Sequence, residues 1–310
     1  MYGSWLRRGG GVLLIAGMAL ALVALREILA ANATSAAGSA PEQLYIGLRR
    51  SSYGLPKMNK DHAWWISRAQ TMAARFPGAV PLMLEIVSNY QEDGSTALEF
   101  RRPADDKGPT GRIAFAPDTL DHEAALAAYD AKGVKAILQV ESGDADVGRC
   151  FEIAWLRFKQ HPCVMGFAMD AEWYFTNKSP DKSGIPVPDD AARRWMEQVL
   201  GYNKNFVLVL KHWDATHMPK TYRHPHLWFL TDSQEFKTRA DWLKDMASWD
   251  RAFKGSVVGA QYGYPKDKKW WSKEKYPPVD LGLALRQQAP AFRCLLWVDF
   301  TADQVTYAAP

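Results

Sequence analysis

Two carboxylates at the end of an apolar run are the side chains of this sequence best suited to chemistry. Asp170 and Glu172 lie in the segment Val164–Tyr174, whose earlier residues are small or apolar. Alternate side chains of a β-strand share a face, so both carboxylates would lie on the face that carries Gly166 and Ala168, roughly 7 Å apart. Buried carboxylates are costly without partners, so the pair indicates a site with room for a ligand.

Paired carboxylates suit the hydrolysis of glycosides, which needs a proton donor at the leaving oxygen and stabilisation of an oxocarbenium-like centre. We expect Glu172 to be the general acid/base, its pKa raised by burial and by Asp170 as a like-charged neighbour. Retaining enzymes place a second carboxylate about 5–5.5 Å from the acid. Asp232, Glu235 and Asp299 are the candidates for that group, unless the substrate supplies its own nucleophile.

Eight short apolar segments alternate with helical segments along the chain, and they must position these carboxylates. The predicted strands are 44–48, 80–87, 135–140, the segment from Val164, 205–210, 226–230, 256–260 and 294–298. The predicted helices are 61–76, 118–132, 146–160, 189–200, 239–253 and 282–288. This alternation predicts an α/β fold with a parallel sheet closed into a (β/α)8 barrel of the TIM type.

Charged, amide or aromatic residues follow almost every predicted strand at its C-terminal side. Barrels of this type build their sites at that face, from several strand ends. We expect Tyr174, Trp213, Tyr262 and Trp297 to be flat surfaces for sugars, unless they pack the barrel instead. The full set predicted to bind substrate is Tyr174, Trp213, Asp232, Glu235, Gln261, Tyr262, Trp297 and Asp299.

The segment Gly-Phe-Ala-Met-Asp-Ala-Glu-Trp-Tyr, residues 166–174, resembles the fourth-strand signature of family 18 glycoside hydrolases, the chitinase-like barrels. The resemblance implies that Glu172 is the general acid, and that Asp170 orients an acetamido group whose carbonyl oxygen acts as the nucleophile. The segment Leu296–Asp299 resembles the last strand of that family, where a Trp floors the sugar subsite. The family's deeper acid is Ala168 here.

Two further functions fit the sequence. A catalytically inactive barrel that binds glycans or acts as a scaffold in the cell envelope is favoured by Ala168. A metal-dependent hydrolase is suggested by several histidines, but His224 and His226 precede a strand and would lie opposite His212. A Schiff base on Lys211 would need a dry pocket, which the flanking sequence does not indicate. We therefore expect no metal and no cofactor.

The N-terminus has the layout of a secretory signal. Arg7 and Arg8 precede a largely apolar run, 9–25, and a small-residue segment follows over 30–40. The run is slightly short for a spanning helix, yet it could tether the chain to a membrane. We expect 1–40 to be a signal peptide or anchor plus linker, and 41–310 to be a single catalytic barrel. The protein would be secreted, periplasmic or held at the cell envelope.

Composition limits the remaining functions. The 310 residues include 47% apolar ones, enough for one large core, and the net charge of +4 indicates no nucleic-acid partner. Thirteen tryptophans are unusually many, and exposed ones often bind flat ligands. The three cysteines fit a disulfide framework badly and are expected to be buried thiols. A carbohydrate is the expected partner.

Overall fold

A computed structural model describes residues 43–54 and 60–307. The predicted signal segment 1–40 and the predicted tether 9–25 lie outside the described residues. Within the described part of the chain, no helix is both long enough and apolar enough to cross a membrane.

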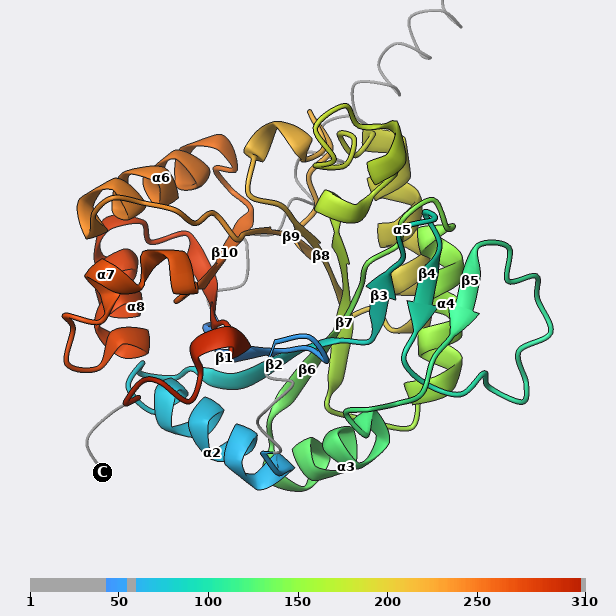
Figure 1. Cartoon of the computed structure of the whole chain (residues 1–310), viewed down its shortest axis with the longest axis horizontal. Helices are drawn as coiled ribbons and strands as arrows, with labels where there is room; N and C mark the ends of the chain where they lie inside the picture. Colours follow the sequence, from blue (N-terminus) through green and yellow to red (C-terminus); the bar gives the residue numbers. More distant parts are fainter. Residues whose placement is uncertain (1–42, 55–59, 308–310) are drawn as a thin grey trace, which may run out of the picture. The chain divides into compact units, whose positions relative to one another are not determined.

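The described chain folds into a closed barrel of eight parallel strands, which confirms the predicted (β/α)8 architecture (Figure 1). The barrel strands are β1 (Tyr45–Arg50), β2 (Val80–Ile86), β6 (Lys135–Val140), β7 (Val164–Asp170), β8 (Val207–Lys211), β9 (Leu227–Thr231), β10 (Val257–Tyr262) and β11 (Phe292–Trp297). Neighbours around the barrel follow the order of the chain. The first and last strands pair with each other, Tyr45 opposite Cys294, and so close the sheet.

Helices form a ring outside the barrel, as Figure 1 shows. They are α2 (His62–Ala73), α3 (His122–Lys132), α4 (Val147–Phe158), α5 (Asp189–Tyr202), α6 (Arg239–Ala252), α7 (Lys268–Trp271) and α8 (Pro277–Gln288). Helix α3 begins later than the predicted Asp118, because Asp121 adopts the capping position and accepts a hydrogen bond from the Ala124 amide. Gly133 ends this helix in the left-handed conformation, as expected.

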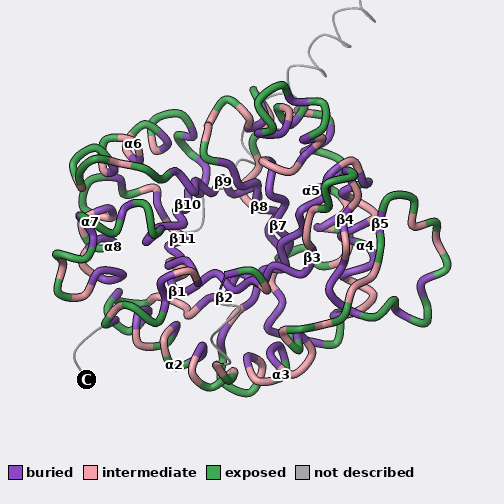
Figure 2. The backbone as a smooth tube through the Cα atoms, in the orientation of Figure 1, coloured by how far each residue is buried: buried purple, intermediate pink, exposed green. Residues whose placement is uncertain are grey.

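Alternation along the strands divides the apolar side chains into two layers. One set fills the barrel interior and includes Ala168, Val209 and Leu296, while the other packs between the sheet and the helices. Figure 2 shows the barrel strands mostly buried and the exposed residues mainly on the outer helices, the loops and the edge of the small sheet. The three cysteines are buried free thiols, as predicted.

Gly166 allows β7 and β8 to approach closely. A Cβ atom placed at this residue would lie 2.1 Å from the carbonyl oxygen of Val207, its partner in the adjacent strand. Only a residue without a side chain fits there. The residue therefore fixes how β7, which carries Asp170, lies against β8, which carries Lys211.

The polar segment 91–111 contributes one strand to a small additional sheet and is otherwise irregular. Strands β3 (Ser88–Tyr90), β4 (Thr96–Leu98) and β5 (Ile113–Phe115) form it, and it lies beside the ends of β6 and β7 (Figure 1). Strands of three residues are too short to produce a recognisable alternation in sequence. The sheet holds Asn89 and Tyr90 at the mouth of the barrel.

Candidate active site

The chain changes conformation between the two predicted catalytic carboxylates. Strand β7 ends at Asp170, and Ala171–Trp173 form a 3₁₀ turn that carries Glu172. Asp170 caps this turn, since its Oδ1 accepts a hydrogen bond of 3.2 Å from the Glu172 amide. The expectation that both side chains share one strand face is therefore wrong for Glu172. Both nevertheless line the same pocket at the C-terminal mouth of the barrel.

Lys211, the last residue of β8, lies between two carboxylates. Its Nζ is 2.6 Å from Asp170 Oδ2 and also forms an ion pair with Asp232 Oδ2, and all three side chains are buried. Burial opposes the charge on this lysine, but Asp170 and Asp232 outweigh that effect and raise its pKa well above the ordinary value. Lys211 is thus a fixed ammonium ion and lacks the free amine that a Schiff base requires.

Three carboxyl groups near Lys211, those of Glu172, Asp170 and Glu141, have raised pKa values. Burial, followed by the charges of Asp170 and Asp232, raises the pKa of Glu172 to about 8. Burial raises the pKa of Asp170 to about 6 in spite of Lys211. Burial and the charge of Asp170 raise the pKa of Glu141 to about 7. At neutral pH Glu172 therefore holds a proton that it can donate.

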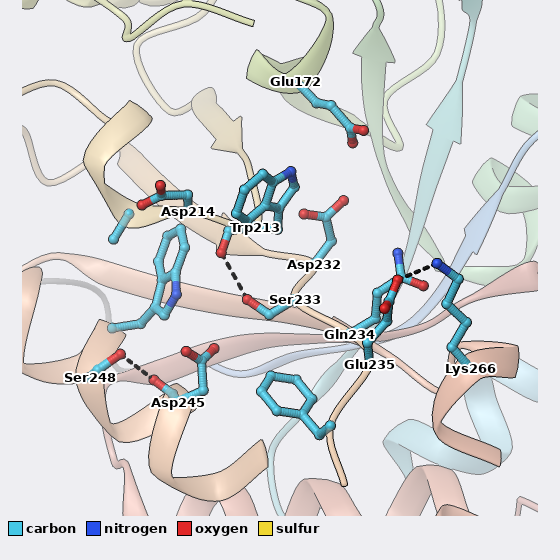
Figure 3. A pocket seen from close by; sticks show the side chains of 13 residues that line it. Glu172, Trp213, Asp214, Asp232, Ser233, Gln234, Glu235, Asp245, Ser248 and Lys266 are labelled. Atoms are coloured by element: carbon cyan, nitrogen blue, oxygen red, sulfur yellow. Dashed lines mark hydrogen bonds and ion pairs between the residues drawn. The ribbon is translucent and has the colours of Figure 1, made fainter. Parts of the chain in front are cut away.

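Asp232 faces Glu172 across the mouth, as Figure 3 shows. One carboxylate oxygen from each of Asp170, Glu172 and Asp232 lies within 4.8 Å of the others. Both Asp170 oxygens are engaged, one by Lys211 and one by the Glu172 amide. Asp232 Oδ1, by contrast, has no hydrogen-bond partner among the described residues. Asp232 is thus the carboxylate with an oxygen left for a ligand.

Three oxygen ligands at this spacing could hold a metal ion. The ammonium of Lys211 already contacts Asp170 and Asp232, and it would repel a divalent cation bound to the same oxygens. The donor set therefore fits an ammonium better than it fits a metal. Of the histidines considered, His212 follows β8, whereas His224 and His226 precede β9 and lie at the opposite end of the barrel.

Two pockets meet at Glu172 and Asp232, and Gln234 also lines both. The first, which we term the aromatic pocket, has a volume of about 440 Å³ and lies over the barrel end. It is lined by Arg49, Tyr53, Asn89, Tyr90, Glu141, Asp170, Glu172, Trp173, Lys211, Asp232, Gln234, Tyr264 and Phe300. The rings of Tyr90 and Trp173 stack at 4.8 Å and form one wall.

The second pocket, which we term the acidic pocket, has a volume of about 720 Å³ and lies over β8, β9 and α6 (Figure 3). Its carboxylates are Glu172, Asp214, Asp232, Glu235 and Asp245. Both volumes fall within the range of roughly 300–1,000 Å³ that is usual for small-molecule sites. Glu172 lies at the boundary between the two pockets. A ligand that occupied both pockets would therefore have the bond between its two parts next to Glu172, the group that can donate a proton.

Several predicted substrate-binding residues lie at this mouth. Trp213, 44% exposed, lines the acidic pocket together with Asp232 and Glu235. Gln261 is buried, and its Oε1 accepts a hydrogen bond of 3.2 Å from Tyr264 in the aromatic pocket. Asp299 is also buried; it binds the guanidinium group of Arg49 and accepts from the Ser51 hydroxyl at 2.6 Å. It therefore supports the mouth and is not free to act as a second catalytic carboxylate.

Tyr174, Tyr262 and Trp297 lie elsewhere, contrary to the expectation that they bind sugar. Tyr262 and Trp297 occupy strand positions that point outward, so their rings pack between the sheet and the helices. The Tyr262 hydroxyl donates to the carbonyl of Pro278 in α8. Tyr174 packs against Trp195 of α5 with ring centroids 5.5 Å apart. None of the three is available as a sugar surface in this structure.

The structure also assigns to the mouth residues that the sequence analysis did not select. Glu141 follows β6, and its carboxylate accepts from the Tyr53 hydroxyl at 2.6 Å and from the Tyr90 amide at 3.2 Å. Its position at a strand end was the signal that could have identified it, as for Lys211. Tyr53 and Tyr90 follow no periodic pattern; a turn brings Tyr53 to the mouth, and the short strand β3 brings Tyr90 there.

No protein-family model and no curated protein matches this chain. Among solved structures, an FMN-binding β-glucuronidase from Facaelibacterium prausnitzii L2-6 is 12% identical with a TM-score of 0.47, covering 84% of this chain and 38% of its own. A β-D-glucuronidase from Dictyoglomus thermophilum is 10% identical with a TM-score of 0.47, covering 84% and 46%. An endo-1,4-β-mannanase from Eisenia fetida is 7% identical with a TM-score of 0.43, covering 81% and 84%.

These structure neighbours are glycoside hydrolases. This chain spans less than half the length of the two glucuronidases. Identities this low indicate a common fold only, and TM-scores below 0.5 carry no weight for the activity of this chain.

Proposed function

We propose that this protein is an exported glycoside hydrolase that acts at the C-terminal mouth of the barrel, with Glu172 as general acid/base. The observation that carries the proposal is the contrast between two neighbouring carboxyl groups. Glu172 is kept protonated by burial and by Asp170, while Asp232 is paired with an ammonium and has one oxygen free. A proton donor beside a carboxylate is what cleavage of a glycosidic bond requires.

In this mechanism Glu172 transfers its proton to the oxygen of the glycosidic bond as the bond to the anomeric carbon breaks. The positive charge that develops on the sugar ring is stabilised by Asp232 across the mouth. Glu172, now ionised, takes a proton from the water that attacks the anomeric carbon and so regains its starting state. Lys211 orients Asp232, because it holds Oδ2 and leaves Oδ1 without a hydrogen-bond partner.

Two routes to the intermediate remain in the proposal. In one, Asp232 attacks the anomeric carbon; in the other, Asp170 orients an acetamido group of the substrate, as the family 18 resemblance implies. Oxygens of the three acids within 4.8 Å of one another suit a retaining enzyme, and both routes retain the configuration. Only the second needs an N-acetyl group next to the cleaved bond, so matched substrates with and without that group separate the routes.

The decisive experiment is a screen of labelled glycans with the wild-type protein and Glu172→Gln. We expect the substitution to lower kcat by roughly 10²–10⁴-fold, because glutamine keeps the shape of the side chain and has no acidic proton. Glu197→Gln, an exposed change on α5, is the matched control and should keep full activity. Near-normal turnover by Glu172→Gln on a substrate with a poor leaving group would place the acid elsewhere.

A metal-dependent hydrolase is the second candidate, because Asp170, Glu172 and Asp232 have ligand spacing. Metal analysis of the purified protein and activity after chelation separate it from the first candidate. An inactive glycan-binding barrel, consistent with Ala168, would bind a glycan with equal affinity before and after Glu172→Gln and cleave none. A location outside the cytoplasm follows from the signal-like segment 1–40 and belongs to the same proposal.

A further inference from the structure

The acidic pocket is lined by more carboxyl groups than the cations of its own lining can pair. Asp214, Glu235 and Asp245 line it in addition to Glu172 and Asp232. Among the described residues that line it, the only cation is Lys266, and this lysine already pairs with Glu235. The aromatic pocket differs, since it contains Arg49 and Lys211. The two halves of the site therefore present different chemistry to a ligand.

Two carboxylate oxygens of the acidic pocket lack any partner in the described structure. Asp232 is only 6% exposed, and its Oδ1 has no hydrogen bond. Asp245 of α6 is half-buried; its Oδ2 makes no hydrogen bond of normal geometry, although the Ser233 hydroxyl lies close enough to lower its pKa in part. Burial, together with the nearby charge of Asp214, raises the pKa of Asp245. Buried acceptors without donors are costly, so a ligand that brings donors and positive charge would be favoured here.

We propose that the acidic pocket binds a sugar unit that carries a free, positively charged amino group, as in a de-N-acetylated hexosamine. The inference deepens the proposed function and rests on it, since it names the substrate class of the same site. An ammonium offers three hydrogen-bond donors and a positive charge to the carboxylates beside which it binds, while Trp213, exposed on the same pocket, offers a flat apolar face to the sugar ring.

The same charges argue against other glycans in this pocket. A hexuronic acid would bring a carboxylate among carboxylates, and like charges at short range repel. An N-acetyl group replaces the ammonium by a neutral amide with one N–H donor, so it would leave most of the acidic oxygens unsatisfied. Specificity would therefore come from attraction of the amine and from repulsion of acidic sugars.

The test is calorimetric binding to the intact chain with Glu172→Gln, which prevents cleavage. The probes are 1,4-linked hexosamine oligosaccharides of equal length, fully N-acetylated, partly de-N-acetylated or with all amines free, and a hexuronic acid oligosaccharide. Hydrogen bonds to charged groups correspond to roughly ten-fold to a hundred-fold in affinity. We expect an oligosaccharide with free amines to bind at least ten-fold more tightly than its N-acetylated counterpart, and the hexuronic acid oligosaccharide to bind most weakly.

Asp245→Asn and Asp214→Asn, each added to Glu172→Gln, should remove most of this preference, and 0.5 M salt should reduce it. Glu197→Gln in the same background removes one carboxylate on α5 and should leave the preference intact. Equal or tighter binding of the N-acetylated form would overturn the proposal. A preference that survives both Asp→Asn changes, or that is abolished by Mg²⁺ or Ca²⁺ bound stoichiometrically at Asp245, would also overturn it.

This design separates the inference from the proposed function. If the wild-type protein cleaves neutral glycans and binds amines no better, the amine pocket is wrong and the hydrolase stands. If amine-bearing oligosaccharides bind through Asp245 and no glycan is cleaved, the pocket stands and the hydrolase is wrong.

Discussion

At the scale of single residues, the acidity of Glu172 depends on its neighbours. Burial is the main cause of its raised pKa, and the charge of Asp170 adds to it, whereas Lys211 acts in the opposite direction. An acid whose pKa lies near 8 stays protonated at neutral pH, and its activity is lost as the pH rises through that value. The pH at which activity falls on the basic side of the profile should therefore depend on the charge of Asp170.

Asp170→Asn tests this dependence. The substitution removes a negative charge next to Glu172, so ionisation of Glu172 becomes easier and its pKa falls. We expect the basic limb of kcat/KM to move to lower pH by roughly one unit, together with a lower kcat because Asn disturbs the 3₁₀ turn and Lys211. Glu197→Gln should leave the limb in place. A limb that does not move with Asp170→Asn belongs to another group.

Trp213 and Trp297 offer a second comparison between residues. Trp213→Ala should raise KM for a glycan and leave the free energy of unfolding almost unchanged, because its ring is exposed on the acidic pocket. Trp297→Ala should lower the free energy of unfolding by about 3–5 kcal/mol, because its ring is buried between sheet and helices. Urea unfolding and steady-state kinetics of both variants measure the contrast. An unstable Trp213→Ala or a stable Trp297→Ala would contradict these positions.

The sequence identified the acids more reliably than the aromatics, and the reason is physical. A carboxylate in an apolar strand is energetically costly unless it is paired or belongs to a functional site. Asp170 therefore indicated a site even though the exact end of the strand was not known from the sequence. Tyr262 and Trp297 are apolar enough to be stable on either face of the sheet. An error of one residue in the predicted position of a strand moves each side chain to the opposite face. Tyr53 reaches the mouth from a turn and Tyr90 from the three-residue strand β3, and neither segment is long enough to show a pattern in the sequence.

At the scale of elements, the position of β7 against β8 determines the ion pair between Asp170 and Lys211, which are opposite each other in the register. Gly166 lies four residues before Asp170, at the closest approach of the two strands. The eight strands were predictable because each is an apolar segment of usual length. The 3₁₀ turn at Glu172 and the small β3–β4–β5 sheet are shorter than any periodicity that could identify them.

Gly166→Ala should destabilise the barrel by about 1–3 kcal/mol or more, since its Cβ atom would force β7 and β8 apart. It should also lower kcat, because Asp170 would move relative to Lys211. Gly201→Ala is the matched control: Gly201 is an exposed glycine of α5 with open space around its Cβ position. This change should stabilise the protein by about 0.5–1 kcal/mol. Equal stabilities of the two variants in urea would contradict the close approach.

At the scale of the whole molecule, all eight barrel strands lie between Tyr45 and Trp297, and the pairing of β1 with β11 closes the sheet. Every residue of both pockets also falls within this range or just beyond it. The acids of the site come from the ends of β6, β7, β8 and β9 or from α6, so the site requires a closed barrel and no single segment could form it.

A protein that starts at Pro41 should therefore fold, unfold in one cooperative transition and keep the activity of the full chain. Circular dichroism on heating and the glycan assay measure both properties. Persistent aggregation of the shortened protein, while the full-length protein behaves well in detergent, would show that 1–40 contributes to folding. Localisation of the full chain fused to a reporter tests the signal separately.

Four carboxyl groups lie close together around one ammonium, those of Glu141, Asp170, Glu172 and Asp232. The affinity for a charged ligand should therefore depend on the pH of the solution. At neutral pH some of these groups retain protons because burial, and then the negative charges of their neighbours, disfavour the ionised forms. An additional positive charge brought by a ligand would relieve that repulsion, and protons would pass to the buffer as the ligand binds. A ligand that keeps its positive charge would bind more tightly as the pH rises toward about 8, whereas the proposed catalytic acid loses its proton above that pH. Binding and cleavage of the glycan would then have different pH optima, and the pH of the compartment would determine whether a bound glycan is cleaved.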